Sequence, residues 1–457
     1  MNAKNLFKGA LIAVLAVLTP INVCGQDALS KSQPQNTLNL DLNQAITIAL
    51  SKNPTIKVAD MEIKKVDYSK KNAWYGILPS LNATGQVAKY LAPATMSFAG
   101  MVIELPTDFN ASAGLSLGLP LFAPALWKSI QMTTLDMQLA VEKAHASKIT
   151  LRNDVTKAYY GVLLAQDSYK TLQHGLALAE DVHRQAKKRF ELGLGSEFDA
   201  ISAEVQVKNL QPNLLEVANG IEQAKMYLKI LMGLEVTLPV EITGNLVDYE
   251  NSIKNTNAFS NLSLEANSDL RQLNIQQQQL QKLLSIQRTQ RMPVLAAFGN
   301  YTYAGTGNKA GNSPFTGQFS PANESWYSQG LIVGLQMNIP LTGIFTNTAK
   351  EQQTKVQIKQ LDIQRGYLEE SLNLLVRTSI NNMGKALKQA ESAKSNEELA
   401  KKGYDISLKR YDNGMGTILE LQSASLSLTQ AQLARSQAIV SYLNSKADLD
   451  KTLGVEN

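Results

Sequence analysis

Apolar residues alternate with small or polar residues in three stretches of the chain, at positions 81–87, 111–119 and 331–339. This period of two predicts β-strands with one apolar and one polar face. A fourth strand is expected after Pro293, which occupies in the second half of the chain the place that Pro79 has in the first. Each strand has roughly the 9–11 residues that cross a bilayer at a tilt.

The same alternation would also suit ordinary half-buried hairpins, and two further features favour a membrane. The connections at 88–108 and 304–328 are long and rich in Gly, Ser, Asn and Pro, as expected of loops at an outer surface. Aromatic residues flank the predicted strands, as they do at membrane interfaces. They are Trp74, Trp127, Trp326 and Tyr327.

Between the strands, a helical pattern runs over 123–192 and again over 343–413. Each stretch has about 70 residues, or about 105 Å at 1.5 Å per residue. Shorter helices are predicted at 40–75, 196–233, 263–292 and 417–453, and stacked in pairs they reach a similar length. Pro212 is expected to kink the second of these short helices.

The last helix has apolar residues on two opposed faces, whereas a helix of a simple bundle has one. Such a helix contacts a neighbour on each side, which predicts a wall or cylinder of helices. One face carries Leu419, Leu426, Leu433, Val440 and Ala447, and the other carries Leu421, Ala424, Leu428 and Ala431.

The chain is internally duplicated. Residues 189–196 (RFELGLGS) reappear as 410–417 (RYDNGMGT), and residues 231–234 match 452–455 at the same offset of 221. Each half therefore reads helix, strand, loop, strand, long helix, turn, helix, which makes the repeat the unit of the fold.

Composition excludes some functions and indicates a compartment. The net charge of +5 is dispersed along helices, so nucleic acid is not an expected partner. Lys4, Lys8 and the apolar run that follows predict a secretory signal peptide over 1–25. Cys24 is the only cysteine; it is removed if cleavage follows Gly25, or it carries a lipid if it is the first mature residue.

Four strands do not close a barrel, since about eight are needed. Open sheet edges are not tolerated in lipid. If the strands cross a membrane, several copies of the chain must therefore join to close the sheet. Three copies would supply 12 strands, although this argument does not itself select three over two or four.

Catalysis has no support in the sequence. His145, His174 and His183 are scattered along one predicted helix, without the spacing that presents two metal ligands on one face. Metalloprotease, nucleophile-elbow and phosphate-loop motifs are absent from the sequence. We expect no enzyme activity, no cofactor and no metal.

The doubled layout, the two Gly-rich turns and the matching terminal segments 231–234 and 452–455 together resemble the outer membrane efflux protein family. The resemblance extends from about residue 40 to residue 455. It implies a mixed α and β membrane protein in which a homotrimer forms one 12-stranded β-barrel, continuous with a long periplasmic α-helical barrel. It also implies an exit duct in the outer membrane lipid, serving an inner-membrane transporter through a periplasmic adaptor protein, in drug efflux or type I secretion. The alternative is a periplasmic or surface coiled-coil structural protein without a pore.

The two turns are the candidate functional site, at the periplasmic end of the helices. Glycine allows the left-handed backbone that ends a helix and keeps a turn slim, and Ser or Thr caps the next helix. The turns are expected either to dock an adaptor or simply to connect helices. These residues are Arg189, Gly193, Leu194, Gly195 and Ser196 in the first turn, and Arg410, Gly414, Met415, Gly416 and Thr417 in the second.

Asp199 and Glu420 follow the two caps by three residues, the spacing of a capping box. The other interpretation is an acidic ring at a constricted entrance, which would attract cations. The family member used for comparison carries two acids in the helix after the second turn, where this chain has Glu420 and Ser423, so the resemblance leaves a double acidic ring in doubt.

The predicted division of the chain follows from these elements. The segments are 1–25 (signal peptide), 26–39 (N-terminal extension), 40–75 (helix), 76–122 (transmembrane β-hairpin), 123–235 (long helix, tip turn and return helix), 236–262 (linker or equatorial segment), 263–292 (helix), 293–342 (second transmembrane β-hairpin) and 343–457 (second long helix, tip turn and return helix).

Overall fold

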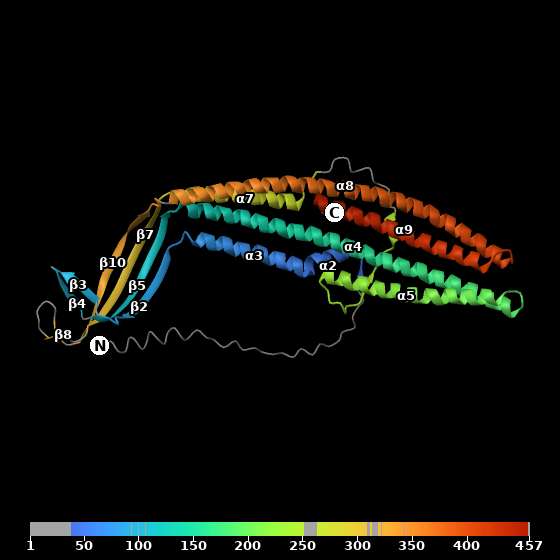
Figure 1. The fold of residues 1–457 in the computed structure, drawn as a ribbon, viewed down its shortest axis with the longest axis horizontal. Coiled ribbons are helices and arrows are strands. Elements are labelled where there is room, and N and C mark those ends of the chain that lie inside the picture. Colours follow the sequence, from blue (N-terminus) through green and yellow to red (C-terminus); the bar gives the residue numbers. More distant parts are fainter. Residues whose placement is uncertain are drawn as a thin grey trace.

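The computed structural model describes residues 38–455, except 93, 99, 106, 251–262, 309–310, 313–318, 321 and 342. The predicted signal peptide, Cys24 and most of the N-terminal extension lie outside the described residues, as does the end of the 236–262 linker. A sheet occupies one end of the elongated molecule, and helices run from it to two turns at the other end (Figure 1).

The sheet has four antiparallel strands in the order β10-β7-β5-β2. They are β2 (Ser80–Lys89), β5 (Thr107–Phe122), β7 (Val294–Asn308) and β10 (Asn323–Asn338). Among the described strands of this sheet, β2 and β10 each have a neighbour on one side only.

The strands extend further than the alternating pattern predicted, and the expected loops contain further strands. The segment predicted as the loop 88–108 includes β3 (Ala94–Phe98) and β4 (Met101–Leu105), which pair as an antiparallel hairpin. The run Met-Val-Ile-Glu-Leu in β4 has the apolar and β-branched residues that favour a strand. In the other connection, β8 (Gly311–Asn312) pairs with β9 (Phe319–Ser320).

Two helices span the whole helical part of the molecule. They are α4 (Pro124–Glu191) and α8 (Gly343–Asp412), with 68 and 70 residues, or about 100 Å each. The shorter helices are α2 (Leu42–Lys52), α3 (Pro54–Tyr75), α5 (Glu197–Met232), α7 (Ser268–Thr289) and α9 (Ile418–Leu453). The helix α5 continues through Pro212.

The single helix predicted over 40–75 is wrong, because the chain forms two helices there. Asn53 lies between α2 and α3 with an extended backbone, and Pro54 begins α3. Proline suits the first position of a helix and disfavours helical backbone in the residue before it. The helix that continues the line of α5 is therefore α3 alone.

Two buried asparagines join the short helices end to end. Asn53, at the start of α3, donates a 2.6 Å hydrogen bond to the carbonyl of Leu231 in α5. Asn267, at the start of α7, donates a 2.8 Å hydrogen bond to the carbonyl of Thr452 in α9. Each stacked pair consists of helices of 36 and 22 residues, so the two halves of the chain have the same construction.

Glycine makes both joints possible. Gly233 and Gly454 end α5 and α9 with positive φ angles of 67° and 71°. A side chain at Gly233 would collide with the backbone of Lys52, and one at Gly454 with the backbone of Ala266. The segments 231–234 and 452–455 of the repeat therefore mark the places where one helix ends against the next.

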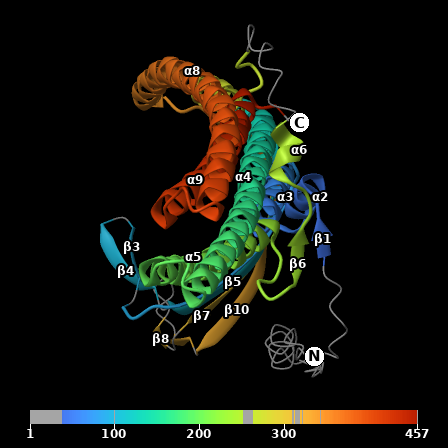
Figure 2. The same cartoon turned by 90° about the vertical axis from the view of Figure 1, so that its right-hand side faces the viewer.

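The helices form a curved wall (Figure 2). Toward the turns its order is α8, α9, α4, α5, and toward the sheet it is α8, α7, α4, α3. The strands β1 (Leu38–Leu40) and β6 (Val240–Ile242) pair in parallel and lie with α2 and α6 (Leu246–Glu250) on the convex side. Among the described residues, no helix combines the length and apolarity that crossing a membrane requires.

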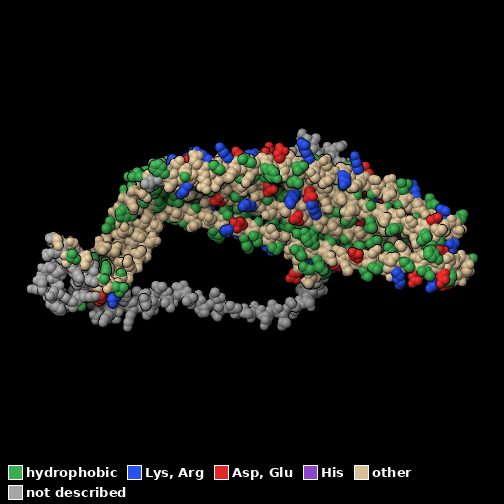
Figure 3. Space-filling model, viewed as in Figure 1, with side chains coloured by type: hydrophobic (Ala, Val, Ile, Leu, Met, Phe, Trp, Pro, Cys, Tyr) green, Lys and Arg blue, Asp and Glu red, His purple; other side chains and the backbone are tan. Residues whose placement is uncertain are grey.

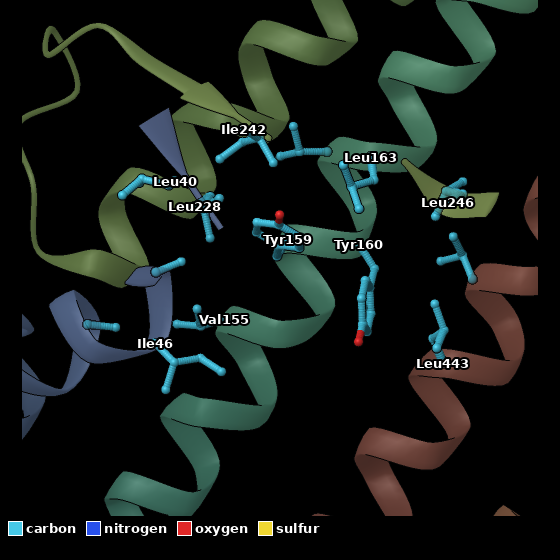
Figure 4. Packing of buried hydrophobic residues seen from close by; sticks show 14 of the residues in the cluster. Leu40, Ile46, Val155, Tyr159, Tyr160, Leu163, Leu228, Ile242, Leu246 and Leu443 are labelled. Atoms are coloured by element: carbon cyan, nitrogen blue, oxygen red, sulfur yellow. The ribbon is translucent and has the colours of Figure 1, made fainter. Parts of the chain in front are cut away.

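The largest hydrophobic core lies where α4 meets these convex-side elements (Figure 4). Tyr159 is fully buried and donates a hydrogen bond to the carbonyl of Thr243. The Tyr160 ring meets the Tyr249 ring edge-on at 5.2 Å. Burial raises the pKa of the Tyr159 and Tyr160 hydroxyls, so both stay neutral.

The helices α4 and α5 form a first helical hairpin, and α8 and α9 form a second. An ion-pair network joins α6 to this second helical hairpin. The Glu250 carboxylate accepts hydrogen bonds from Arg435 of α9 and Lys394 of α8. Arg435 also donates a 2.8 Å hydrogen bond to Glu397 of α8. Burial alone would raise the pKa of Glu250, but the hydrogen bonds and charges of Arg435 and Lys394 outweigh it and lower that pKa.

Candidate functional site

The strand register places one continuous apolar face on the sheet. Val333, Gly299, Leu117 and Leu81 lie in one row across the four strands, because paired residues point to the same side. Val333 and Leu81 are 73% and 69% exposed, so the chain itself leaves this face uncovered. Charged side chains cover the helices in Figure 3, whereas the visible part of the sheet has few between its ends.

The opposite face of the sheet carries mostly small and polar residues. The next row consists of Ile332, Asn300, Ser116 and Asn82, and glycines face the same side. Phe298 and Ile332 are large exceptions on this face, and the ring of Phe298 lies over Gly334 of the neighbouring strand. A sheet with these two faces suits lipid on one side and water on the other.

Exposed aromatic residues lie near both ends of the strands. At the helical end, the rings of Phe122 and Trp127 meet edge-on at 5.5 Å, and Trp74 is 54% exposed. At the far end, Tyr303 and Trp326 stack with ring centroids 6.0 Å apart. Aromatic rings gather at this level where a protein crosses a membrane interface.

At the opposite end of the molecule, the two turns have the same backbone structure. Gly193 and Gly414 have φ angles of 67° and 71°, the left-handed conformation that ends a helix. The amide of Leu194 donates to the carbonyl of Arg189, and that of Met415 to the carbonyl of Arg410, both at 2.8 Å. This bond, with a second from the glycine amide, is the Schellman arrangement.

The second glycine of each turn, Gly195 or Gly416, lies so close to the preceding arginine that a side chain would not fit. A Cβ atom at Gly195 would lie 3.0 Å from the Cβ of Arg189, and one at Gly416 would lie 3.1 Å from the Cβ of Arg410. Leu194 is 77% exposed and Met415 is 67% exposed. Each turn thus presents one apolar side chain on a slim backbone.

The helix that follows each turn is capped by a hydroxyl. Ser196 accepts a 3.0 Å hydrogen bond from the amide of Phe198, and Thr417 accepts one of 3.2 Å from the amide of Glu420. The predicted capping box is half formed at Thr417 only, because the Ser196 hydroxyl is bonded by the amide of Phe198 rather than by that of Asp199, and within the described residues neither Asp199 nor Glu420 returns a bond to the cap. The Glu420 carboxylate instead lies 3.7 Å from the guanidinium of Arg410.

Arg189 connects the two turns. Its guanidinium donates hydrogen bonds of 2.8 Å and 2.7 Å to the carbonyls of Tyr411 and Asp412, at the end of α8. It also lies over the Tyr411 ring, 5.1 Å from the centroid. A cation is favourable at the carbonyl end of a helix, so Arg189 caps a helix of the other repeat.

Arg410 is the counterpart of Arg189 and behaves differently. Its guanidinium donates a 3.2 Å hydrogen bond to the carbonyl of Met415, in its own turn. Its side chain is 53% exposed in the chain. Two arginines in nearly identical sequences thus have different partners.

Sequence reasoning overlooked Tyr411, which belongs to the core between the two hairpins. Its side chain is buried, whereas Phe190, at the same position of the first turn, is 44% exposed. Burial, with the charge of Asp199, raises the pKa of Tyr411.

His145 and His183 have structural partners. His145 Nδ1 lies 3.0 Å from the hydroxyl of Ser268, and His183 Nδ1 lies 3.3 Å from the carbonyl of Ala200. In the part of the chain that the structure describes, His, Cys, Asp and Glu form no group of three or more suited to a metal ion.

Comparisons with known proteins agree with this arrangement. The family model of the outer membrane efflux proteins matches residues 45–234 and 259–455. A probable efflux pump outer membrane protein, TtgC of Pseudomonas putida, is 24% identical over 90% of this chain and 82% of its own length. The outer membrane protein TolC of Vibrio cholerae is 23% identical over 75% of this chain and 76% of its own length.

Solved structures show the same fold. The crystal structures of CusC match with a TM-score of 0.72 and 16% identity, over 94% of this chain and 96% of theirs. The Campylobacter jejuni CmeC outer membrane channel matches with a TM-score of 0.69 and 15% identity, over 95% and 94%. Because the two segments that match the family model cover most of this chain, the chain belongs to the outer membrane efflux protein family.

Proposed function

We propose that this protein is the outer membrane exit duct of a tripartite efflux or type I secretion system. Substrates pass through it passively, since the energy comes from an inner-membrane transporter. The observation that carries the proposal is a sheet with one lipid-suited face, attached directly to helices of about 100 Å. Family membership supports the same function.

The duct is a homotrimer in this proposal. The edge strands β2 and β10 each offer unpaired backbone groups, which lipid does not tolerate. Strand directions alternate across the sheet, so β2 of one copy can pair antiparallel with β10 of the next. Three copies give a closed barrel of 12 strands, and the curved wall of helices gives the periplasmic tunnel.

The two turns are the proposed docking site of a periplasmic adaptor protein. They lie at the end of the helices furthest from the sheet (Figure 1). Leu194 and Met415 project from slim turns whose glycines leave no bulk beside them. Exposed apolar residues of this kind suit contact with another protein.

Asp199 and Glu420 are proposed to form an acidic ring at the entrance of the tunnel. They follow the caps of two neighbouring hairpins, so three copies would place six carboxylates near one level. Such a ring attracts cations and opposes tight closure. Glu420 is balanced in part by Arg410, which limits the free charge.

The test is the size and behaviour of the particle extracted from outer membranes in detergent. We expect a trimer that requires detergent and conducts ions in planar bilayers. A matched pair of variants on β10 examines the sheet: Val333→Arg, on the apolar face, should reduce membrane assembly, because a charge facing lipid costs up to about 2–4 kcal/mol. Gln336→Arg, on the opposite face, should assemble normally.

A water-soluble monomer or dimer without conductance would contradict the exit duct and favour a coiled-coil structural protein. Equal effects of the two substitutions would contradict the assignment of the lipid-facing side.

A further inference from the structure

We propose that Arg410 makes between neighbouring copies the contact that Arg189 makes within one chain. In the assembled ring, its guanidinium donates hydrogen bonds to the carbonyls of Phe190 and Glu191 of the next copy. This inference rests on the proposed ring of several chains, and it assigns a contact that holds neighbouring hairpins together at the entrance.

The duplication makes the two arginines equivalent. Arg189 and Arg410 are separated by the offset of 221 that also relates Gly193 to Gly414. Both precede turns with the same Schellman bonds and the same left-handed glycine. The environment of each arginine therefore differs only in what lies beside its hairpin.

The wall of helices supplies the missing neighbour. Within the chain, α4 of the first hairpin packs on α9 of the second. The described residues leave α8 at one edge of the wall and α5 at the other. When copies join edge to edge, α8 meets the next α5, which repeats the α4–α9 contact and brings Arg410 to the end of the next α4.

The expected acceptors match those that Arg189 uses. The carbonyl of Tyr411 accepts from the amide of Gly414 and from Arg189. The equivalent carbonyl, that of Phe190, accepts from the amide of Gly193, and a second lone pair can accept from an incoming guanidinium. Like Asp412, Glu191 has its carbonyl in the last turn of a long helix, where a cation is favourable.

The exposure of the aromatic rings points the same way. Tyr411 is 3% exposed because the first hairpin and Arg189 cover it. Phe190, its counterpart, is 44% exposed at the outer edge of the first hairpin. The guanidinium of Arg410 from the next copy would lie over this ring, as Arg189 lies over Tyr411.

Within one chain, the Arg410 guanidinium donates to the carbonyl of Met415 and approaches Glu420. In the ring it exchanges this weaker contact for two carbonyls and an aromatic face. Three contacts within chains and three between chains then alternate around the entrance, and separation of neighbouring copies breaks only the second kind.

Photocrosslinking distinguishes the two kinds of contact. The full-length protein in outer membranes carries p-benzoylphenylalanine at position 410 in one variant and at position 189 in another. We expect position 410 to give dimer and trimer bands, with the adduct mapped to the end of α4, and position 189 to give adducts within one chain. Adducts from position 410 within its own chain only, in particles whose mass in detergent is that of a trimer, would overturn the inference. Particles that are not oligomers would instead contradict the proposed duct.

Channel recordings supply a second readout that does not depend on the crosslinker. Arg410→Gln should raise the open fraction of the isolated channel at least about tenfold, the factor for losing a hydrogen bond to a charged group. Lys409→Gln is the matched control, since it removes the same charge from an exposed residue one position away and should leave the open fraction unchanged. Equal effects of the two substitutions would attribute the change to charge alone and overturn the proposed contact.

Discussion

Replacing Asn267 by alanine should loosen the joint between α9 and α7. The side chain is 4% exposed and makes three hydrogen bonds: it donates to the carbonyl of Thr452 at 2.8 Å and accepts from the amides of Asp269 and Leu270 at 3.0 Å and 3.1 Å. Loss of the helix cap costs about 1 kcal/mol. A buried carbonyl left unpaired costs about 1–3 kcal/mol more.

The combined cost of about 2–4 kcal/mol should appear as local opening at the joint. Hydrogen exchange of the detergent-solubilised protein, followed by mass spectrometry, measures this opening. Since 1.4 kcal/mol is a factor of ten, the amides of Asp269 and Leu270 should exchange at least about 30-fold faster in Asn267→Ala.

Two further variants separate the contributions. Asn267→Asp keeps the acceptor for both amides but loses the donor to Thr452, so its exchange should be intermediate. Asn43→Ala replaces an exposed asparagine of α2 and should leave the α7 amides unchanged. Unaltered protection at Asp269 and Leu270 in Asn267→Ala would refute the view that this side chain holds the joint.

Three other outcomes are expected. Gly414→Ala should destabilise the second turn by about 1–2 kcal/mol, because a Cβ is unfavourable at a φ of 71°, and thermal unfolding of the purified protein should start earlier than in wild type. Neutralising Asp199 and Glu420 together, as Asn and Gln, should weaken block by divalent cations and change conductance in bilayers; unchanged recordings would leave these acids no role beyond the ends of their helices. Glu250 has a pKa below its ordinary value of 4.5, so its stabilising bond to Arg435 is complete above about pH 4.5 and is lost as pH falls through the lowered pKa. At each pH, the rate of pepsin cleavage near α6 in wild type should be compared with that in Glu250→Gln, because the pH dependence of pepsin cancels in this ratio. The ratio should be low above about pH 4.5 and approach one as the pH falls.

The features that the sequence predicts well are those that a short stretch of residues determines. The alternation at 331–339 assigns faces to β10 without knowledge of its partners, because side chains of a strand point to opposite sides in turn. The turn at Gly193 and Gly414 is equally local, since a left-handed glycine ends a helix through bonds within six residues. The docking and acidic-ring roles of the turns stay predictions.

The features that sequence reasoning overlooked depend on residues far apart in the chain. Asn53 and Leu231 are 178 positions apart, and Asn267 and Thr452 are 185 apart. A signal was present, because Asn53 and Asn267 differ by 214, the offset that also relates Pro79 to Pro293. Local sequence does not predict the different hydrogen-bond partners of Arg189 and Arg410, because the residues around the two arginines are nearly the same.

The end-to-end joints have a mechanical consequence for the wall. The α5–α3 joint lies beside α4, and the α9–α7 joint lies between α4 and α8, both of which pass the joint without interruption. Both joints lie 36 residues from the turns, and each has a continuous helix beside it that holds the two joined helices in line. Among the described helices, α4 and α8 alone reach from the turns to the strands. A force applied at the turns is therefore transmitted to the sheet through tilting or bending of α4 and α8. The α5–α3 and α9–α7 joints are the points at which the shorter helices can bend relative to each other.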